Sequence, residues 1–180
     1  FIQSAAFPNF FGVAMPLVKY GLPIHPVQLD NVRRFAGYLE DYKCLVLSYE
    51  YMKPDAPDVN AAVVSWIREG GTLIYVGDGS DPFHKIDAWW GQRGYANPAE
   101  HLFELAGLGR DPKEGVHEVG AGKIVVWKEL PARICLSKEL ADQYRSLVQK
   151  TLADTGITWT YRNDLTLHRG PYVISSVMAE

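Results

Sequence analysis

The feature that most constrains the fold is an alternation of two short apolar runs with a helical period. Lys43–Tyr49 and Thr72–Val76 are continuously apolar, as is typical of strands covered on both faces. Between them, Pro57–Glu69 has apolar residues three and four positions apart, and Gly70 and Gly71 end that helix. A strand, a helix and a second strand at this spacing predict a parallel crossover unit, right-handed by strong precedent.

Further segments continue this alternation along the chain. Helices are expected over Pro8–Tyr20, from Asp30 to Leu39, from Asn97 to Gly107, and after Ser137. Strands are expected over Leu22–Leu29, in a hairpin at Val116–Trp127, and in the tail Ile157–Val177. Successive crossover units predict an α/β fold of flavodoxin-like type. We expect a doubly wound, mostly parallel sheet with helices on both faces and a β-rich C-terminal tail.

The composition argues against two classes of partner. The chain has 180 residues, 47% of them hydrophobic, and a net charge of -3, which is ordinary for one domain with a sizeable core. No basic run is present to replace the counterions of a nucleic acid, and no apolar stretch approaches the ~20 residues of a membrane helix. We expect no nucleic-acid partner, no membrane partner and no cofactor.

The cysteines and the chain ends bear on compartment and domain limits. Cys44 and Cys135 lie far apart in apolar runs, so we expect small buried hydrophobes and not a disulfide or a nucleophile. No Asn-x-Ser/Thr sequence occurs, which favours the cytoplasm, although a leader upstream of Phe1 would leave secretion open. Because both ends look cut, we expect a domain at 1–160 and a strand-rich exit segment at 161–180 of a longer polypeptide.

A candidate site is expected beyond the carboxyl ends of the strands, in the turns after Tyr49 and Val76. The loop Gly77–Tyr95 follows a buried strand directly and is polar and aromatic. Its first residues contain two glycines, whereas a dinucleotide fingerprint needs three at fixed spacing. Nucleotide binding through this motif is therefore not expected.

The acidic residues of this loop suggest two interpretations. Asp78, Asp81, His84 and Asp87 are three residues apart and offer oxygen and nitrogen ligands, and hard cations prefer such oxygens. The spacing matches no calcium loop, however, and aspartates are common local caps in polar turns. We expect a solvated or hydrogen-bonded loop and no metal.

The aromatic residues of the loop also leave alternatives open. Trp89, Trp90 and Tyr95 are either core packed under the loop, a platform that stacks on sugars, or an anchor in a subunit interface. Carboxylates beside aromatic rings suit hydroxyl-rich ligands. The candidate ligand-binding residues are therefore Asp78, Asp81, His84, Trp89, Trp90 and Tyr95.

No catalytic residue is predicted. A nucleophile needs a base within hydrogen-bond reach, yet the bend after Val76 contains no cysteine, and Ser80 lies in no Gly-x-Ser-x-Gly sequence. The five histidines form no evident cluster, and His101, inside a capped helix, is expected at the surface or its boundary. Enzymatic activity of this domain alone is not expected.

Three stretches together resemble a known family: Lys43–Glu50 (KCLVLSYE), Ser65–Gly79 (SWIREGGTLIYVGDG) and Val119–Trp127 (VGAGKIVVW). Their order is similar to the class I glutamine amidotransferase-like domain in the middle of certain bacterial β-galactosidases, called their trimerisation domain. The likeness covers roughly residues 10–155, and its motifs are mostly structural. The amidotransferases have a cysteine at the bend after the second strand and a late His-x-Glu pair. This chain has Gly77-Asp78-Gly79 at the bend and no His-x-Glu, so the resemblance implies the fold without the glutaminase chemistry.

The function expected from this resemblance is that of a non-catalytic accessory domain of a larger carbohydrate-active protein, a glycoside hydrolase. The domain would support oligomer assembly or shape a neighbouring active site. Its partners would be other domains of the same polypeptide, further copies of the chain, and a carbohydrate. The alternatives are a sugar-binding module that uses the 77–95 loop, and an independent hydrolase that uses Asp78 or Asp81 in place of a cysteine.

Overall fold

The structure is a computed structural model of the whole chain in which residues 6–177 are described. The chain divides into two compact units, which we call the terminal unit (Phe1–Val27 with Pro131–Glu180) and the central unit (Gln28–Leu130). The fold is mixed α/β, with a mostly parallel four-stranded sheet in the central unit and an antiparallel hairpin near the C-terminus.

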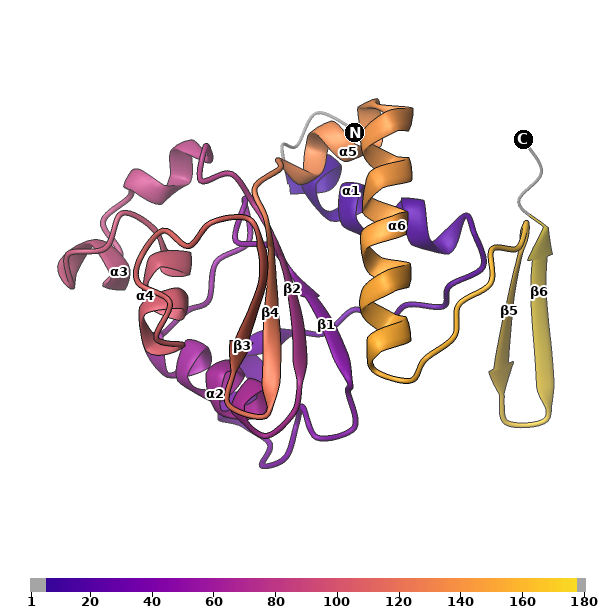
Figure 1. Cartoon of the computed structure of the whole chain (residues 1–180), viewed down its shortest axis with the longest axis horizontal. Helices are drawn as coiled ribbons and strands as arrows, with labels where there is room; N and C mark the ends of the chain where they lie inside the picture. The colour runs from indigo at the N-terminus through magenta and orange to yellow at the C-terminus, as the bar shows by residue number, and fades with distance from the viewer. Residues whose placement is uncertain (1–5, 178–180) are drawn as a thin grey trace. The chain divides into compact units, whose positions relative to one another are not determined.

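The sheet of the central unit has the strand order β1-β2-β4-β3 (Figure 1). β1 (Cys44–Leu47) pairs in parallel with β2 (Thr72–Val76), which pairs in parallel with β4 (Gly122–Trp127). β3 (Gly115–Val119) lies antiparallel to β4 at the other edge. The predicted parallel pair and the predicted hairpin are confirmed.

Burial differs between the two apolar strands that the sequence makes look alike. All residues of β2 are buried, whereas those of β1 are half-buried. The expectation of a strand covered on both faces therefore holds for β2 and is wrong for β1. The physical reason is position, because β1 is an edge strand with a neighbour on one side and β2 is central.

Helices α2 (Pro57–Arg68) and α4 (Pro98–Leu105) pack against each other on one side of this sheet (Figure 1). Both begin with a proline, which is suited to the first helical turn because its missing N–H has no helical partner there. Asn97 caps α4 by accepting hydrogen bonds from the backbone amides of Ala99 and Glu100. Both helices confirm the sequence prediction.

Two glycines of the central unit lie where no side chain fits. A Cβ at Gly71 would lie 2.4 Å from the ring of Trp66 on α2. A Cβ at Gly122 would lie 2.1 Å from the carbonyl oxygen of Ile67 and 2.2 Å from that of Gly71. The end of α2 therefore packs directly on the starts of β2 and β4, and only glycine permits that approach.

The loop that follows β2 contains two short helical turns, η2 (Pro82–Lys85) and α3 (Trp89–Gln92). Neither was expected, because four residues are too few for a helical period to be visible in the sequence.

The terminal unit contains three helices and a hairpin. α1 (Ala6–Val18), α5 (Pro131–Leu136) and α6 (Lys138–Asp154) pack together, and β5 (Asp164–Arg169) pairs antiparallel with β6 (Tyr172–Val177). The predicted helix at the start of the chain, the helix after Ser137 and the strands of the tail are confirmed, and α5 was not predicted. Among residues 6–177, no helix combines the length and apolar character needed to cross a membrane.

Two elements predicted between residues 22 and 39 are wrong. Leu22–Leu29 is not a strand, and its two prolines explain why, since each lacks the N–H that a strand ladder needs. The helix expected from Asp30 is reduced to the 3-10 helix η1 (Leu29–Arg33), followed by turns that include Gly37 at a φ of 69°. Phe35, one of the apolar residues in the span of the expected helix, is 56% exposed.

Candidate functional site

Polar side chains gather at the carboxyl edge of the sheet, where β1 and β2 end side by side. Glu50 follows the end of β1 and is completely buried. Its Oε1 accepts a hydrogen bond from the backbone amide of Gly79 at 2.8 Å, and its Oε2 accepts one from the amide of Asp81 at 3.1 Å. Glu50 thereby holds the loop that follows β2 against the end of β1.

Asp81 makes the reciprocal connection from the loop back to β1. Its Oδ1 accepts from the amide of Phe83 at 2.8 Å and its Oδ2 from the amide of Tyr51 at 2.6 Å. The ammonium group of Lys53 contacts the same Oδ2 and also donates to the carbonyl of Tyr49 at 2.9 Å. Burial acts to raise the pKa of Asp81, but the hydrogen bonds from Lys53 and the two amides outweigh burial and hold that pKa below its usual value.

At two positions of this edge, Tyr51 and Gly77, the backbone lies close to the buried acidic side chains. Tyr51 has a φ of 61°, in the left-handed region that non-glycine residues seldom adopt, and its amide is the one that donates to Asp81. A Cβ at Gly77 would lie 3.0 Å from Oε1 of Glu50 and 3.0 Å from the hydroxyl oxygen of Tyr75. Burial, with Glu50 nearby, raises the pKa of Tyr75, so this phenol is neutral.

His84, on η2, completes the edge. It is only 6% exposed, and its Nε2 lies 3.5 Å from Oε2 of Glu50. Within the described part of the chain, neither ring nitrogen has a hydrogen-bond partner. Glu50, Asp81 and His84 each offer one ligand atom, and these three atoms lie within 4.8 Å of one another. The three residues, which we call the edge triad, could hold a metal ion.

The other carboxylates of the loop lie apart from the edge triad. Asp78 is exposed and accepts a hydrogen bond from the amide of Ser80 at 3.0 Å. Asp87 is also exposed and accepts from the side-chain amide of Gln92 at 3.1 Å. Of the four loop residues that the sequence offers as ligands, the structure therefore brings only Asp81 and His84 together.

The two tryptophans of the loop use their indole N–H groups to hold the loop in place. Trp90 is 3% exposed and donates to the carbonyl of His84 at 2.8 Å. Trp89 is half-buried and donates to the carbonyl of Pro54 at 2.9 Å. Trp90 is therefore core beneath the loop, whereas part of Trp89 reaches solvent.

Tyr95 and Trp89 flank a second buried histidine, His101 on α4. Their ring centres lie 5.2 Å and 5.1 Å from that of His101, which is 7% exposed. The guanidinium group of Arg110 lies 4.6 Å from the centre of the half-buried Tyr95 ring, whose hydroxyl contacts Glu104. The expected surface or boundary position of His101 is wrong, because aromatic rings cover it.

Asn60, on α2, connects this second histidine to the sheet. Its side-chain nitrogen donates to Nδ1 of His101 at 3.1 Å and to the carbonyl of Pro98 at 2.9 Å, and its oxygen accepts from the hydroxyl of Tyr49. With Nδ1 as the acceptor, His101 carries its proton on Nε2. Burial, with the charge of Arg93 as a further cause, lowers the pKa of His101, so the neutral ring is favoured.

The cysteines lie away from the edge triad or are poorly ionised. Cys44 begins β1, at the end of that strand remote from Glu50, and burial raises its pKa to about 11. Cys135 is exposed, which contradicts the expected burial, because the short helix α5 buries only Pro131 and Ile134. Its thiol lies 3.2 Å from the carbonyl of Pro8, and partial burial raises its pKa as well. A protonated thiol is a poor nucleophile, so neither cysteine suits covalent catalysis.

Comparisons of the chain with protein-family models, with curated proteins and with solved structures found no match. The site at the edge of the sheet contains two buried carboxylates held by backbone amides, one ammonium group, and one imidazole without a hydrogen-bond partner in the described residues. Such a set can order a loop and bind a cation.

Proposed function

We propose that this chain is a non-catalytic α/β domain of a larger carbohydrate-active protein, in which it supports subunit assembly or shapes a neighbouring active site. The observation that carries the non-catalytic part is the use made of the two buried acids. Each oxygen of Glu50 and Asp81 accepts a hydrogen bond from a backbone amide, and Lys53 also contacts Asp81. These hydrogen bonds are what holds the loop in place, so both acids have a structural use that accounts for their burial.

The proposal includes the finer architecture, an amidotransferase-like, doubly wound sheet. Support comes from the three stretches that carry the resemblance, since they form the adjacent strands β1, β2 and β4. The close approaches at Gly71 and Gly122 explain why Gly-Gly and Gly-x-Gly occur in these stretches. At the bend after β2, where the amidotransferases have a cysteine, the chain has Gly77-Asp78-Gly79, and the space beside Gly77 is taken by Glu50 and Tyr75.

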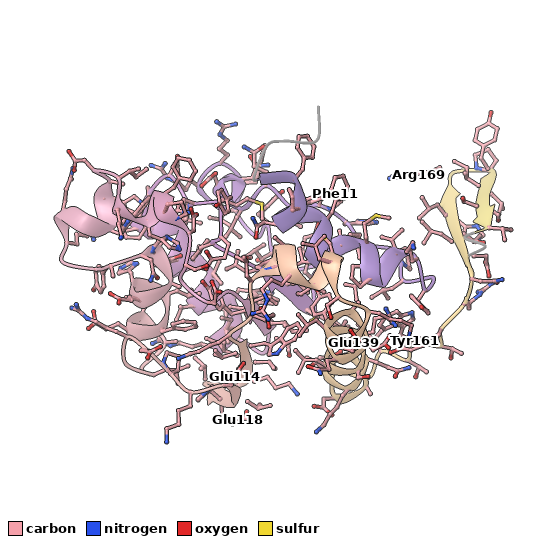
Figure 2. The ribbon with its side chains drawn as sticks, turned by 90° about the horizontal axis from the view of Figure 1, so that it is seen from above. Phe11, Glu114, Glu118, Glu139, Tyr161 and Arg169 are labelled. Carbon is pink, nitrogen blue, oxygen red and sulfur yellow. The ribbon has the colours of Figure 1, made fainter. Side chains whose placement is uncertain are left out.

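A role in assembly is supported by the apolar surface of the terminal unit. Large exposed apolar side chains rarely cluster on a monomer unless another surface covers them. On α1 they include Phe11, labelled in Figure 2, and on β6 they occur at four of six positions. The exposed residues are Phe7, Phe10, Phe11 and Met15 on α1, and Tyr172, Val173, Ile174 and Val177 on β6.

An assay of glycoside hydrolysis tests the non-catalytic part. The purified chain is incubated with a panel of nitrophenyl glycosides, and we expect no turnover above the buffer rate. Turnover that disappears in Asp81→Asn and persists in the exposed control Asp87→Asn would overturn the proposal and favour an independent hydrolase.

Sedimentation velocity over a hundredfold range of concentration tests the assembly part. We expect association that weakens in the double variant Val173→Thr with Ile174→Thr on β6. Val116→Thr, which removes an exposed apolar residue on β3 of the central unit, is the matched control. Sedimentation of the chain as a monomer at every concentration would remove assembly from the proposal.

A sugar-binding role is the second candidate, and the partial exposure of Trp89 and Tyr95 favours it. The rings flank His101 and leave some of their surface available for stacking on a sugar. Calorimetric titration with galactosides and other glycans tests it. Binding heat that is lost in Tyr95→Ala but kept in the control Tyr172→Ala, on β6 of the terminal unit, would support this role. No heat with any glycan would end it for this chain.

A further inference from the structure

We propose that the edge triad, Glu50, Asp81 and His84, binds a divalent first-row transition metal ion such as Zn²⁺. This site is additional to the proposed accessory function and does not depend on it. The bound ion would join the end of β1 to the loop after β2 through side chains that already lie together.

His84 has unmet hydrogen-bonding capacity. Leaving a buried polar group without a hydrogen bond is unfavourable, so buried imidazoles normally have hydrogen-bond partners. His84 is 6% exposed, and in the described residues both of its ring nitrogens are without one. Its Nε2 points to the carboxylate of Glu50, at 3.5 Å from Oε2. A metal between them would give this nitrogen the partner that it lacks.

The spacing of the three ligand atoms suits a small divalent ion. Zn²⁺ holds nitrogen and oxygen ligands at about 2.0–2.2 Å, which sets neighbouring ligands of a tetrahedral site about 3.4 Å apart. The separation of 3.5 Å between Nε2 of His84 and Oε2 of Glu50 fits this requirement. All three atoms lie within 4.8 Å of one another, so the widest pair would close by at most about 1.4 Å through side-chain rotation.

The charges of the buried side chains also favour a divalent ion at this site. Glu50 and Asp81 bring two negative charges into the interior, and Lys53 brings one positive charge. A divalent ion neutralises both carboxylates when the ammonium group leaves Asp81, and buried charges require such pairing. Lys53, whose side chain is 12% exposed, already binds here as a cation, with the carbonyl of Tyr49 as its second acceptor.

The outer contacts of the edge triad suit metal ligands. The backbone amides of Gly79 and Asp81 orient the carboxylate of Glu50, and that of Tyr51 orients Asp81. Hydrogen-bonded carboxylates of this kind are typical of metal sites. One imidazole among the donors favours a transition metal over Ca²⁺ or Mg²⁺, which take oxygen ligands.

Metal retention tests the proposal. The chain is treated with chelator, incubated separately with ZnCl₂, MnCl₂ and CaCl₂, desalted, and analysed by elemental mass spectrometry. We expect about one Zn²⁺ retained per chain, less Mn²⁺ and no Ca²⁺. His84→Leu should lose the Zn²⁺, and Asp78→Asn, at the exposed carboxylate of the same loop, should keep it. Failure of the wild-type chain to retain Zn²⁺, or equal retention by His84→Leu, would overturn the site.

Lys53 provides a second arm that leaves every ligand in place. Since its ammonium group competes with the metal for Oδ2 of Asp81, Lys53→Met should tighten Zn²⁺ binding roughly tenfold in a competition titration against a fluorescent chelator. Weaker binding in Lys53→Met would contradict the proposal. Nitrogen NMR of the His84 ring distinguishes a nitrogen that binds a metal from one that binds a proton. A signal of metal-bound Nε2 after Zn²⁺ is added would support the site. A ring that stays in the imidazolium form when Zn²⁺ is added would overturn it.

Discussion

Two buried histidines of the central unit, His84 and His101, have opposite surroundings although their exposures are nearly equal, at 6% and 7%. His101 receives a hydrogen bond from Asn60 on Nδ1 and is flanked by two aromatic rings. His84 lies beside two carboxylates, with Nε2 3.5 Å from Oε2 of Glu50, and neither of its nitrogens has a hydrogen-bond partner in the described residues. The difference shows that burial alone does not assign a role to a histidine. The partners of its two nitrogens distinguish a structural residue from one that is ready for a ligand.

The largest loss of stability is expected in Asn60→Leu, because Asn60 connects His101 to Tyr49, which follows β1. This change leaves the hydroxyl of Tyr49 and Nδ1 of His101 without a partner in the interior, at about 1–3 kcal/mol for each group, and removes the side-chain hydrogen bond to the carbonyl of Pro98. We expect the free energy of unfolding, measured with urea, to fall by about 3 kcal/mol or more. Ala61→Leu, at the exposed neighbouring position of α2, is the control and should change it by less than about 0.5 kcal/mol.

His101→Leu should have the next largest effect. The change removes the acceptor of one Asn60 hydrogen bond and the contacts with two aromatic rings, while the apolar volume is largely kept. We expect a loss of about 2 kcal/mol by urea unfolding. A loss below about 0.5 kcal/mol would remove the distinction between the two histidines.

The pH dependence of stability sharpens the comparison further. Burial lowers the pKa of His101 in the folded state below the value of about 6.5 in the unfolded chain. The unfolded state therefore binds the proton more readily, and stability from this group is complete above about pH 6.5 and declines as the pH falls below it. Urea midpoints measured between pH 7.5 and pH 5 should show a smaller decline in His101→Leu than in the wild-type chain. Equal declines would assign the effect to other groups.

His84→Leu should have the smallest effect in metal-free protein. The imidazole has no hydrogen bond to lose within residues 6–177, and an apolar side chain costs less to bury. We expect the free energy of unfolding to stay within about 0.5 kcal/mol of wild type or to rise. A loss as large as that of His101→Leu would mean that His84 is also a structural residue.

Much of the fold could be predicted because the spacing of the apolar residues and the residues that end an element indicate the same secondary structure in these segments. The helix ended by Gly70 and Gly71, the buried strand Thr72–Val76 and the hairpin at Val116–Trp127 are all confirmed. The predictions failed where local signals competed, as in Leu22–Leu29, whose apolar pattern lost to its prolines. The prediction that Cys135 is buried also failed, because which face of a short helix is buried depends on packing that the sequence does not display.

The candidate site was predicted in part. The rule that parallel strands end at a common edge directs attention to the loop after Val76, and two residues of that loop, Asp81 and His84, lie together in the edge triad. Glu50 was missed because it entered only as the last residue of the stretch Lys43–Glu50 that carries the family resemblance, directly after the apolar run. Its position, the first charged residue after β1 and next to the end of β2, was the available signal. The backbone amides that hold Glu50 lie 29 and 31 residues further on, and no local pattern reveals such contacts.

The hydrogen bonds from the amides of Gly79 and Asp81 to Glu50 have a consequence for the order of folding. These amides belong to an irregular loop, yet their acceptor lies just beyond the end of β1, about 30 residues earlier in the chain. The loop can become ordered only after β1 and β2 have come together. Its amide protons should therefore exchange with deuterium as slowly as those of the central strand, in the same cooperative opening, although loop amides usually exchange fast.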